Sequence, residues 1–238
     1  MEKKYRTEPE GDMLRIFALK DFSDVKKGDK GGLIRRESNL SQEGNCWVYE
    51  KAMVYGNAWV FENAKVYGEA RVSGAGRIYG NARVFGNAWI HEFVSIYDNA
   101  EVCGFACVEG YASIYGYASI YERAIISGYY TRISGNAKVC GFARVSHNAK
   151  VYGDAMVSGN ARIGENAVIC GKAKLWSTFN NSVTTLVKNS KDYVILGIER
   201  KFRVFSSNLE DNKVFIPVAD ENYIKNIKTI RQLYEKEI

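Results

Sequence analysis

Hydrophobic residues recur at every sixth position over much of this chain. An aliphatic residue holds the sixth position from Val48 to Ile126 and, after one extra residue, from Ile133 to Leu175, which makes about 22 units. Four residues after each aliphatic from Val48 to Ile169 comes a small residue, and only Val94 and Tyr130 depart from this rule. Neither a helix nor an ordinary strand has a period of six. Because the Gly-Asn pairs inside units such as 78–83 tolerate positive φ, each unit predicts a short strand followed by a corner.

Three such units are expected to form one triangular coil. Each residue then stacks on the residue eighteen positions further along, at about 4.8 Å, the spacing of neighbouring strands. The aliphatic and the small residue point inward, and burial of each Val or Ile contributes about 1.5–3 kcal/mol. Only adjacent coils can bury these side chains, so the stack needs covered ends. The pattern therefore predicts an all-β solenoid, a single-stranded parallel β-helix of about seven triangular coils.

The six-residue pattern also divides the chain into three segments. Residues 1–47 contain one strand-like run, Met13–Leu19, and Gly-rich turns, and are expected to cap the first coil. Residues 48–176 form the β-helix. Residues 177–238 lose the pattern and predict a small α+β appendage, with three short strands and then a helix that begins near Asp220. The predicted strands are Tyr193–Ile198, Phe202–Phe205 and Lys213–Val218.

The repeat resembles the hexapeptide repeat of left-handed β-helix proteins, and Ile163–Ala167 is its plainest copy. The first part of the chain also resembles the YdcK-like proteins, a bacterial and phage group named as acyltransferases largely by fold. Five stretches carry this second resemblance: Lys3–Arg6, Ala18–Phe22, Asp24–Gly28, Gly31-Gly32 and Asn39–Val48. Together the two resemblances cover about residues 3–176. They imply left-handed coiling, a homotrimer and, for an enzyme, acetyl-CoA or another acyl-CoA as cosubstrate.

The outward residues are expected to form columns along the prism. Residues directly after the aliphatic positions give two aromatic columns and one mostly polar column. The residue three after the aliphatic is normally Asn but becomes aromatic near the middle of the chain. A bulky ring gains nothing at a corner that favours the left-handed region, so these rings favour an interface. The resulting aromatic girdle comprises Phe105, Tyr111, Tyr115, Tyr117, Tyr121, Tyr129, Tyr130 and Phe142. For the two aromatic columns, simple stacking of rings is the alternative to an interface. For the girdle, the alternative is a base-, sugar- or nucleotide-stacking surface.

One pair of residues could support catalysis. His91 lies in a unit without the Gly-Asn-Ala motif, and Glu109 is eighteen residues further along, so the two side chains are expected to be adjacent. The resemblance to hexapeptide acyltransferases implies a histidine base, and a general base needs such an orienting partner. The other histidine, His147, has no carboxylate stacked on it. The chain lacks the long loop that closes over the active site in those enzymes, and a surface His beside a Glu is common.

Composition and charge narrow the choice of function only slightly. The net charge of +6 is spread along the chain, whereas nucleic-acid binders concentrate basic residues on one face. Among the five cysteines, Cys46 is expected to point inward, and Cys103, Cys140 and Cys170, which follow aliphatic positions, are expected to face outward. The cysteines contain no CxxC motif and are expected to be reduced, with neither disulfides nor a metal site. No apolar run reaches eighteen residues and no charged-then-apolar leader is present, so a soluble cytoplasmic protein without membrane contact is expected.

Three functions therefore remain open. The first is a non-catalytic binding or assembly scaffold that presents the girdle to a protein partner or to further copies of the chain, without a cofactor. The second is an acyl-CoA-dependent acyltransferase that acts at a trimer interface. The third is a phage-type inhibitor or nucleotide-sequestering protein that acts on host defence. Whether the chain is an enzyme is left open by the sequence.

Overall fold

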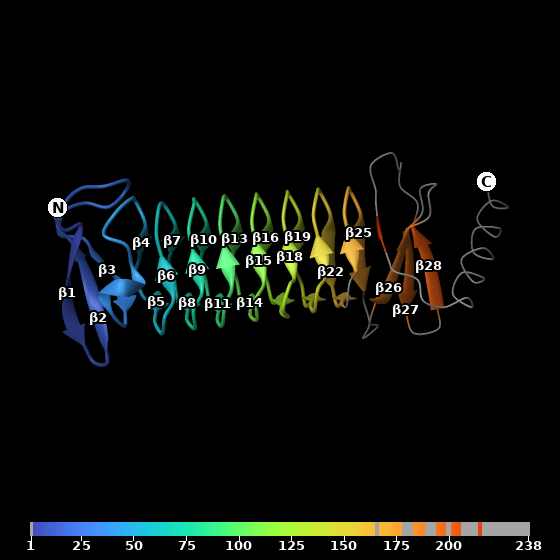
Figure 1. The fold of residues 1–238 in the computed structure, drawn as a ribbon, viewed down its shortest axis with the longest axis horizontal. Helices are drawn as coiled ribbons and strands as arrows, with labels where there is room; N and C mark the ends of the chain where they lie inside the picture. Colours follow the sequence, from blue (N-terminus) through green and yellow to red (C-terminus); the bar gives the residue numbers. More distant parts are fainter. Residues whose placement is uncertain are drawn as a thin grey trace.

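The computed structural model describes residues 2–164 and 167–177, together with strands at 183–188, 194–198, 201–205 and 214–215. The chain forms a parallel β-solenoid of about eight turns, in which the coils lie side by side along one axis (Figure 1). The predicted solenoid is therefore confirmed. It has about one turn more than the seven predicted, because the N-terminal segment extends it: β3 (Lys30–Ile34) pairs in parallel with β5 (Met53–Val54).

Three parallel sheets form the faces of the prism. The first face consists of β4 (Trp47–Val48), β7 (Lys65–Val66), β10 (Arg83–Val84), β13 (Glu101–Val102), β16 (Ser119–Ile120), β19 (Lys138–Val139), β22 (Met156–Gly159) and β25 (Lys174–Ser177). The second face consists of β5, β8 (Arg71–Val72), β11 (Trp89–Ile90), β14 (Cys107–Val108), β17 (Ile125–Ile126), β20 (Arg144–Val145) and β23 (Arg162–Ile163). The third face consists of β6 (Trp59–Val60), β9 (Arg77–Ile78), β12 (Ser95–Ile96), β15 (Ser113–Ile114), β18 (Arg132–Ile133), β21 (Lys150–Val151) and β24 (Val168–Ile169).

The register between coils is the predicted eighteen residues. On the second face, for example, Ile90 pairs with Val72 on one side and Val108 on the other. The aliphatic residue of each strand and the small residue before the next strand are buried and form one continuous core. Val94, the first exception to the small-residue rule, is also fully buried. Each coil is therefore held by backbone hydrogen bonds and by side chains stacked on identical positions above and below.

The single extra residue in the repeat is accommodated after Ile126. Thr131 fills the inward position and is fully buried, whereas Tyr130, which the count places there, is 66% exposed. The Thr131 hydroxyl lies within hydrogen-bond distance of the carbonyl oxygens of Ser127 and, at 2.8 Å, of His147, which share its single proton. A tyrosine ring exceeds the space that an alanine normally occupies, so the chain bulges outward by one residue and inserts the smaller threonine.

Positive φ angles fall at a different corner position from the one predicted. They occur two residues after the aliphatic, at glycines such as Gly80 (φ 67°) and at a few acidic residues such as Glu92 (φ 63°). In the described units the following residue, which is most often Asn or aromatic, does not have a positive φ. The acidic residues are useful there because their carboxylates reach the next coil, where the Gly110 amide donates to Glu92 Oε2 at 2.7 Å. The aromatic rings therefore impose no backbone strain, and the prediction that they occupy strained corners was wrong.

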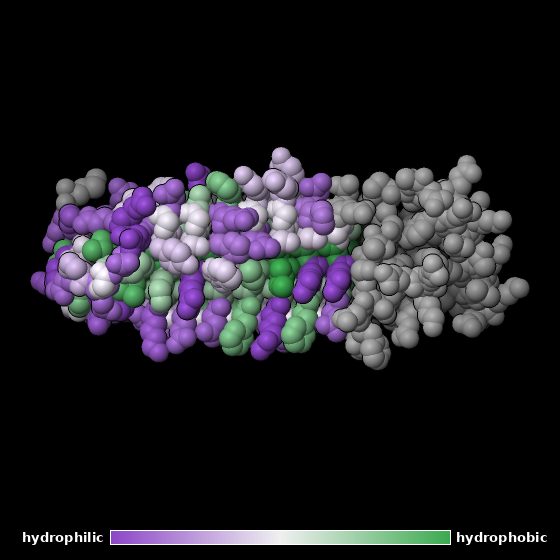
Figure 2. Space-filling model, turned by 90° about the horizontal axis from the view of Figure 1, so that it is seen from below, coloured by the Kyte–Doolittle hydropathy of each residue, from purple (hydrophilic) through white to green (hydrophobic). Residues whose placement is uncertain are grey.

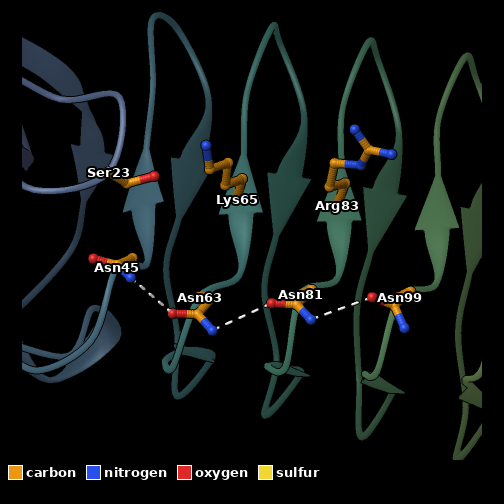
Figure 3. A pocket seen from close by; sticks show the side chains of 7 residues that line it. All are labelled: Ser23, Asn45, Asn63, Lys65, Asn81, Arg83 and Asn99. Carbon is orange, nitrogen blue, oxygen red and sulfur yellow. Dashed lines mark hydrogen bonds between the residues drawn. The ribbon is translucent and has the colours of Figure 1, made fainter.

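Asparagines that directly follow a positive-φ residue hold one edge of the prism together. Between the third and first faces, Asn45, Asn63, Asn81 and Asn99 form a ladder in which each amide donates to the next carbonyl at 3.2 Å (Figure 3). The ladder, with Ser23, Lys65 and Arg83, lines a shallow groove of about 470 Å³. Lys65 pairs with Asp24, and Arg83 with Glu101, so these two cations are already neutralised.

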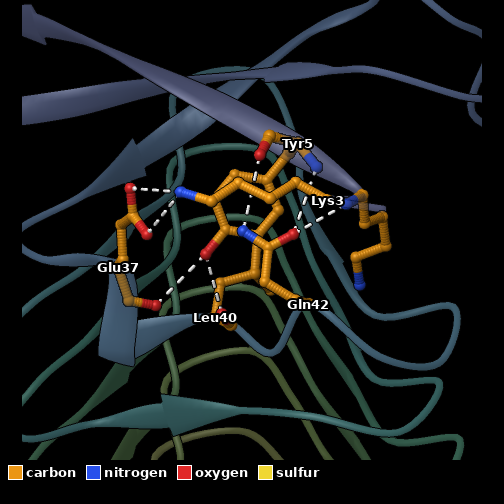
Figure 4. A network of polar contacts seen from close by, with 6 residues as sticks. Lys3, Tyr5, Glu37, Leu40 and Gln42 are labelled. Atoms are coloured by element: carbon orange, nitrogen blue, oxygen red, sulfur yellow. Dashed lines mark hydrogen bonds and ion pairs between the residues drawn. The ribbon is translucent and has the colours of Figure 1, made fainter. Parts of the chain in front are cut away.

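The N-terminal segment forms a small antiparallel sheet that covers the first coil. Strand β1 (Tyr5–Glu10) pairs with β2 (Met13–Ala18), and β2 pairs with β3. A short 3-10 helix, η1 (Glu37–Asn39), follows. The Tyr5 hydroxyl donates to the Leu40 carbonyl at 2.8 Å, and Gln42 Oε1 accepts from the Tyr5 amide (Figure 4).

Lys4 is almost fully buried, and its ammonium donates to three backbone carbonyls, among them Cys46 O at 3.0 Å. Burial lowers the pKa of Lys4.

Four further strands follow the prism. They are β26 (Val183–Lys188), β27 (Val194–Ile198), β28 (Lys201–Phe205) and β29 (Val214–Phe215). The last three overlap the strands predicted from the sequence, whereas β26 was not predicted. The helix predicted from Asp220 lies outside the described residues. The division of the chain into segments 1–47, 48–176 and 177–238 stays a prediction. Within the described chain, no helix has the length and apolar character needed to span a membrane.

All five cysteines are free, as expected. Cys46 fills an inward position and is fully buried. Cys140 and Cys170 lie in outward columns but are only 4% and 2% exposed, so the prediction that they face solvent was wrong. Each is hydrogen-bonded to the tyrosine one coil before it, Tyr121 or Tyr152, and these larger side chains shield the thiols.

Candidate functional site

The predicted aromatic columns exist on the first and third faces. On the third face, Phe61, Tyr79, Tyr97 and Tyr115 stack at 4.8, 4.9 and 5.0 Å between ring centroids. On the first face, Tyr67 stacks on Phe85 at 4.7 Å. These rings are half-buried because each covers its neighbour. Tyr115 belongs to this stack, so stacking alone accounts for it. Tyr121 lies in the corresponding column of the first face, between Cys103 and Cys140, and is hydrogen-bonded to Cys140.

Strongly exposed rings have a different distribution. On the side of the prism seen in Figure 2, hydrophobic side chains lie in short rows between hydrophilic ones. In the described part of the chain, seven of the ten exposed large hydrophobic side chains lie on the second face and its two edges. We call this set the aromatic surface: Trp89, Phe93, Phe105, Tyr111, Tyr129, Tyr130 and Phe142. Among the girdle residues, Tyr117 is exposed on the opposite edge, where it contacts no other ring in the described part.

The two edges of the aromatic surface are built differently. On the edge between the first and second faces, the Arg123 guanidinium lies between two rings, 5.4 Å from the centroid of Phe105 and 5.8 Å from that of Phe142. On the edge between the second and third faces, Tyr111 stacks on Phe93 at 4.6 Å and on Tyr129 at 5.4 Å. One edge is therefore a cation held between aromatic rings, and the other is a purely aromatic stack.

The strands between these edges carry the predicted histidine and glutamate. His91 follows β11 and Glu109 follows β14, so the parallel register places the two side chains on adjacent coils. His91 Nε2 lies 3.0 Å from Glu109 Oε2, which confirms the predicted contact. Trp89 packs against the His91 ring with centroids 4.7 Å apart. The imidazole is thereby oriented by a carboxylate on one side and an indole on the other.

A cysteine joins this pair. Cys107 precedes Val108 on β14, and its Sγ lies 3.8 Å from His91 Nε2. Partial burial, with a further effect from the Glu109 carboxylate, raises the pKa of Cys107 to about 11. Because this value is far above neutral pH, Cys107 is a protonated thiol rather than a reactive thiolate in the metal-free protein.

The sequence pattern indicated only part of this site. It paired His91 with Glu109 but treated them separately from Phe105 and Tyr111, which the structure places on the two edges of the same face. It missed Trp89, Phe93 and Cys107. The missed signal was the residue before each aliphatic: in a strand the residues on both sides of an inward residue point outward.

Comparison with known proteins points to one group. The YdcK beta solenoid repeat family matches the chain at residues 77–92 and 149–165. A relative described as "Uncharacterized acetyltransferase YdcK" from Escherichia coli (strain K12) is 54% identical over 37 residues. That match covers 16% of this chain and 11% of the relative. These matches and the solenoid fold make the chain similar to the YdcK-like β-solenoid proteins over the matched residues.

Proposed function

We propose that this protein is a binding and assembly scaffold and that the aromatic surface is its contact surface. The observation that carries this proposal is the concentration of exposed rings on one face and its two edges. The exposed fractions of these side chains run from 46% for Tyr111 to 69% for Tyr129. Clustered exposed apolar side chains mark interaction sites on soluble proteins, and aromatic and Arg side chains are enriched in such contacts.

The partner that fits this surface best is a second and third copy of the chain. A closed ring of three copies needs a heterologous contact, in which one part of the surface meets a different part of the neighbouring copy. The two unlike edges supply such a pair: Arg123 with Phe105 and Phe142 on one edge, and the stack around Tyr111 on the other. Arg123 of one copy would face the rings of the next, a favourable cation–π arrangement. The second faces then point toward the common axis.

Replacing Phe105 and Tyr111 together by Asn tests this assembly. Asn occupies the same unit position elsewhere, for example at Asn81 and Asn99, so the solenoid is expected to stay folded. Each substitution removes an anchor from one edge, and loss of an interface anchor costs about 2 kcal/mol or more, roughly 30-fold in affinity. Size-exclusion chromatography with light scattering is expected to show a trimer for the wild type and a monomer for the double variant.

Tyr117→Asn is the matched control, because it makes the same replacement at the same unit position on the remaining edge. This variant is expected to stay trimeric. Circular dichroism establishes that all three proteins are folded. A monomeric wild type, or a double variant that assembles as well as the control, would contradict the proposal.

A second candidate function is acyl transfer from acyl-CoA. The 3.0 Å contact between His91 Nε2 and Glu109 Oε2 favours it, as does the similarity to the E. coli relative described as an uncharacterized acetyltransferase. If Nε2–H donates to Glu109, Nδ1 is free to accept a proton from the acceptor's hydroxyl or amine. The deprotonated nucleophile attacks the thioester carbonyl, and coenzyme A leaves as the thiol after it takes up the proton. Acetyl-CoA would be the cosubstrate.

A thermal-shift titration with acetyl-CoA tests this candidate. A ligand at 100 times its Kd stabilises the folded state by about 2.7 kcal/mol. If turnover is found, His91→Ala should reduce it by about 10²–10⁴-fold, the usual contribution of a general base. Glu109→Gln should give a smaller loss, and His147→Ala none. Acetyl-CoA that leaves the melting temperature unchanged, or full turnover in His91→Ala, would rule out this function for the site.

A further inference from the structure

His91, Cys107 and Glu109 bring three different metal-binding atoms to one point on the second face. The imidazole nitrogen, the thiol sulfur and a carboxylate oxygen all lie within 4.8 Å of one another. We propose that these three residues bind a divalent transition metal ion, with zinc as the preferred ion. This inference goes beyond the assembly function, and it does not depend on it.

The separations between the donor atoms are close to those of a tetrahedral zinc site. Bond lengths of about 2.3 Å to sulfur and 2.0–2.1 Å to nitrogen or oxygen place sulfur and nitrogen about 3.6 Å apart, and nitrogen and oxygen about 3.4 Å apart. The observed separations are 3.8 Å from Cys107 Sγ to His91 Nε2 and 3.0 Å from that nitrogen to Glu109 Oε2. Each of these two separations is within a few tenths of an ångström of the tetrahedral value. The third, from Cys107 Sγ to the Glu109 carboxylate, is at most 4.8 Å, so rotation of the side-chain ends by up to about an ångström would complete the geometry.

The backbone holds the three residues in place before any metal arrives. Cys107 and Glu109 flank the buried Val108, the last residue of β14, so both point outward on the same face. The His91 amide donates to the Val108 carbonyl at 3.1 Å, and the Glu109 amide donates to the Ile126 carbonyl at 2.9 Å. Because neighbouring coils fix these strands on both sides, little conformational entropy is lost when the ion binds.

The donor set selects the class of metal. Magnesium and calcium prefer oxygen ligands alone, whereas one imidazole, one thiolate and one carboxylate suit zinc and its neighbours in the first transition row. A thiolate and a carboxylate also neutralise the two positive charges of the ion. Three protein ligands leave a fourth position open to water or to another ligand, as in catalytic rather than structural zinc sites.

Metal binding and acyl transfer would compete for the same atoms. A metal bound to His91 Nε2 and Glu109 displaces the hydrogen bond that would orient His91 as a base. The assembly is unaffected, because its anchors lie on the two edges of the face. Metal content and oligomeric state can therefore be measured separately, and failure of one leaves the other standing.

The test is to measure zinc stoichiometry in the untagged, untruncated 238-residue chain under reducing conditions. After removal of metal with a chelator and titration with Zn²⁺, plasma mass spectrometry is expected to find one ion per chain in the wild type. Cys107→Ser and His91→Ala should weaken binding by more than the roughly 10–100-fold that loss of an outer-shell partner costs. Cys103→Ser and His147→Ala are matched controls at a partly exposed cysteine and at the second histidine, and both should retain full binding.

Cobalt provides a second readout that identifies the ligand. Co²⁺-loaded wild type and Cys103→Ser are expected to show a thiolate-to-cobalt charge-transfer band in the near ultraviolet, and Cys107→Ser should lack it. Because all the substituted side chains point outward, circular dichroism should show the same fold in every variant. A wild type that retains no zinc, or a Cys107→Ser variant that binds as tightly as Cys103→Ser, would overturn the proposal.

Discussion

Replacing Ile126 by alanine is expected to lower the free energy of unfolding by about 2–5 kcal/mol, the usual cost of truncating a buried Ile to Ala. Ile126 is fully buried and lies between Val108 and Val145 in the column of inward residues on the second face. The rigid coils on both sides cannot collapse into the space that the missing atoms leave. Urea unfolding followed by circular dichroism would measure the change.

The adjacent residue provides the control. Ile125 is on the same strand but faces outward, so Ile125→Ala removes the same atoms from a partly exposed position. Surface substitutions usually change stability by no more than about 0.5 kcal/mol. Because Ile125 is partly exposed, the change caused by Ile125→Ala should be close to this range. Equal destabilisation by the two substitutions would show that the assignment of inward and outward positions is wrong.

Gly74→Ala is expected to be the second strongly destabilising change. Gly74 has a φ of 65°, in the left-handed region that disfavours any residue with a Cβ. A Cβ at this position would lie 2.7 Å from the Glu92 Cα on the next coil and closer still to the Glu92 amide nitrogen. Backbone strain of this type costs about 1–3 kcal/mol, and the contact with Glu92 adds to that cost. The urea midpoint should fall accordingly.

Gly76→Ala is the matched control, only two residues away. Gly76 does not have a positive φ and occupies the small inward position, where Ala58 lies one coil before it. A Cβ there would meet the Ser73 carbonyl oxygen at 3.2 Å and Val72 Cγ1 at 3.5 Å, contacts that the alanines of other coils make room for. Stability should be unchanged or rise by about 0.4–1 kcal/mol. If Gly76→Ala lost as much stability as Gly74→Ala, the assignment of Gly74 to the corner and Gly76 to the inward position would be wrong.

The core of the fold could be predicted from the sequence because its physical requirement is local and repeated. Every coil must present the same inward aliphatic and small residue to the coil before it, so the count by six also determines the register by eighteen. For the same reason the sequence predicted the contact between His91 and Glu109. The extra residue was harder to locate, since the count alone does not say which residue bulges. The smaller volume of Thr131 compared with Tyr130 was the available signal.

The site was predicted only in part because only some outward positions were considered. Trp89 and Cys107 precede their aliphatic residues and are as outward as His91 and Glu109, which follow theirs. The corner was misplaced by one residue, because Asn tolerates positive φ but Gly, which precedes it, tolerates it better. Cys140 was taken as exposed because a column assignment gives the direction of a side chain but not the size of the neighbour that covers it.

The eighteen-residue register gives the prism something like a reading frame. Gain or loss of eighteen codons would lengthen or shorten the rod by about 4.8 Å, and every later residue would stay on its own face. Gain or loss of six codons would preserve the buried core equally well, yet it would move every later residue to the next face. A six-codon change between His91 and Glu109 would leave the two on different faces of a well-folded rod. Stability alone therefore tolerates indels in steps of six, but the site on the second face tolerates only steps of eighteen.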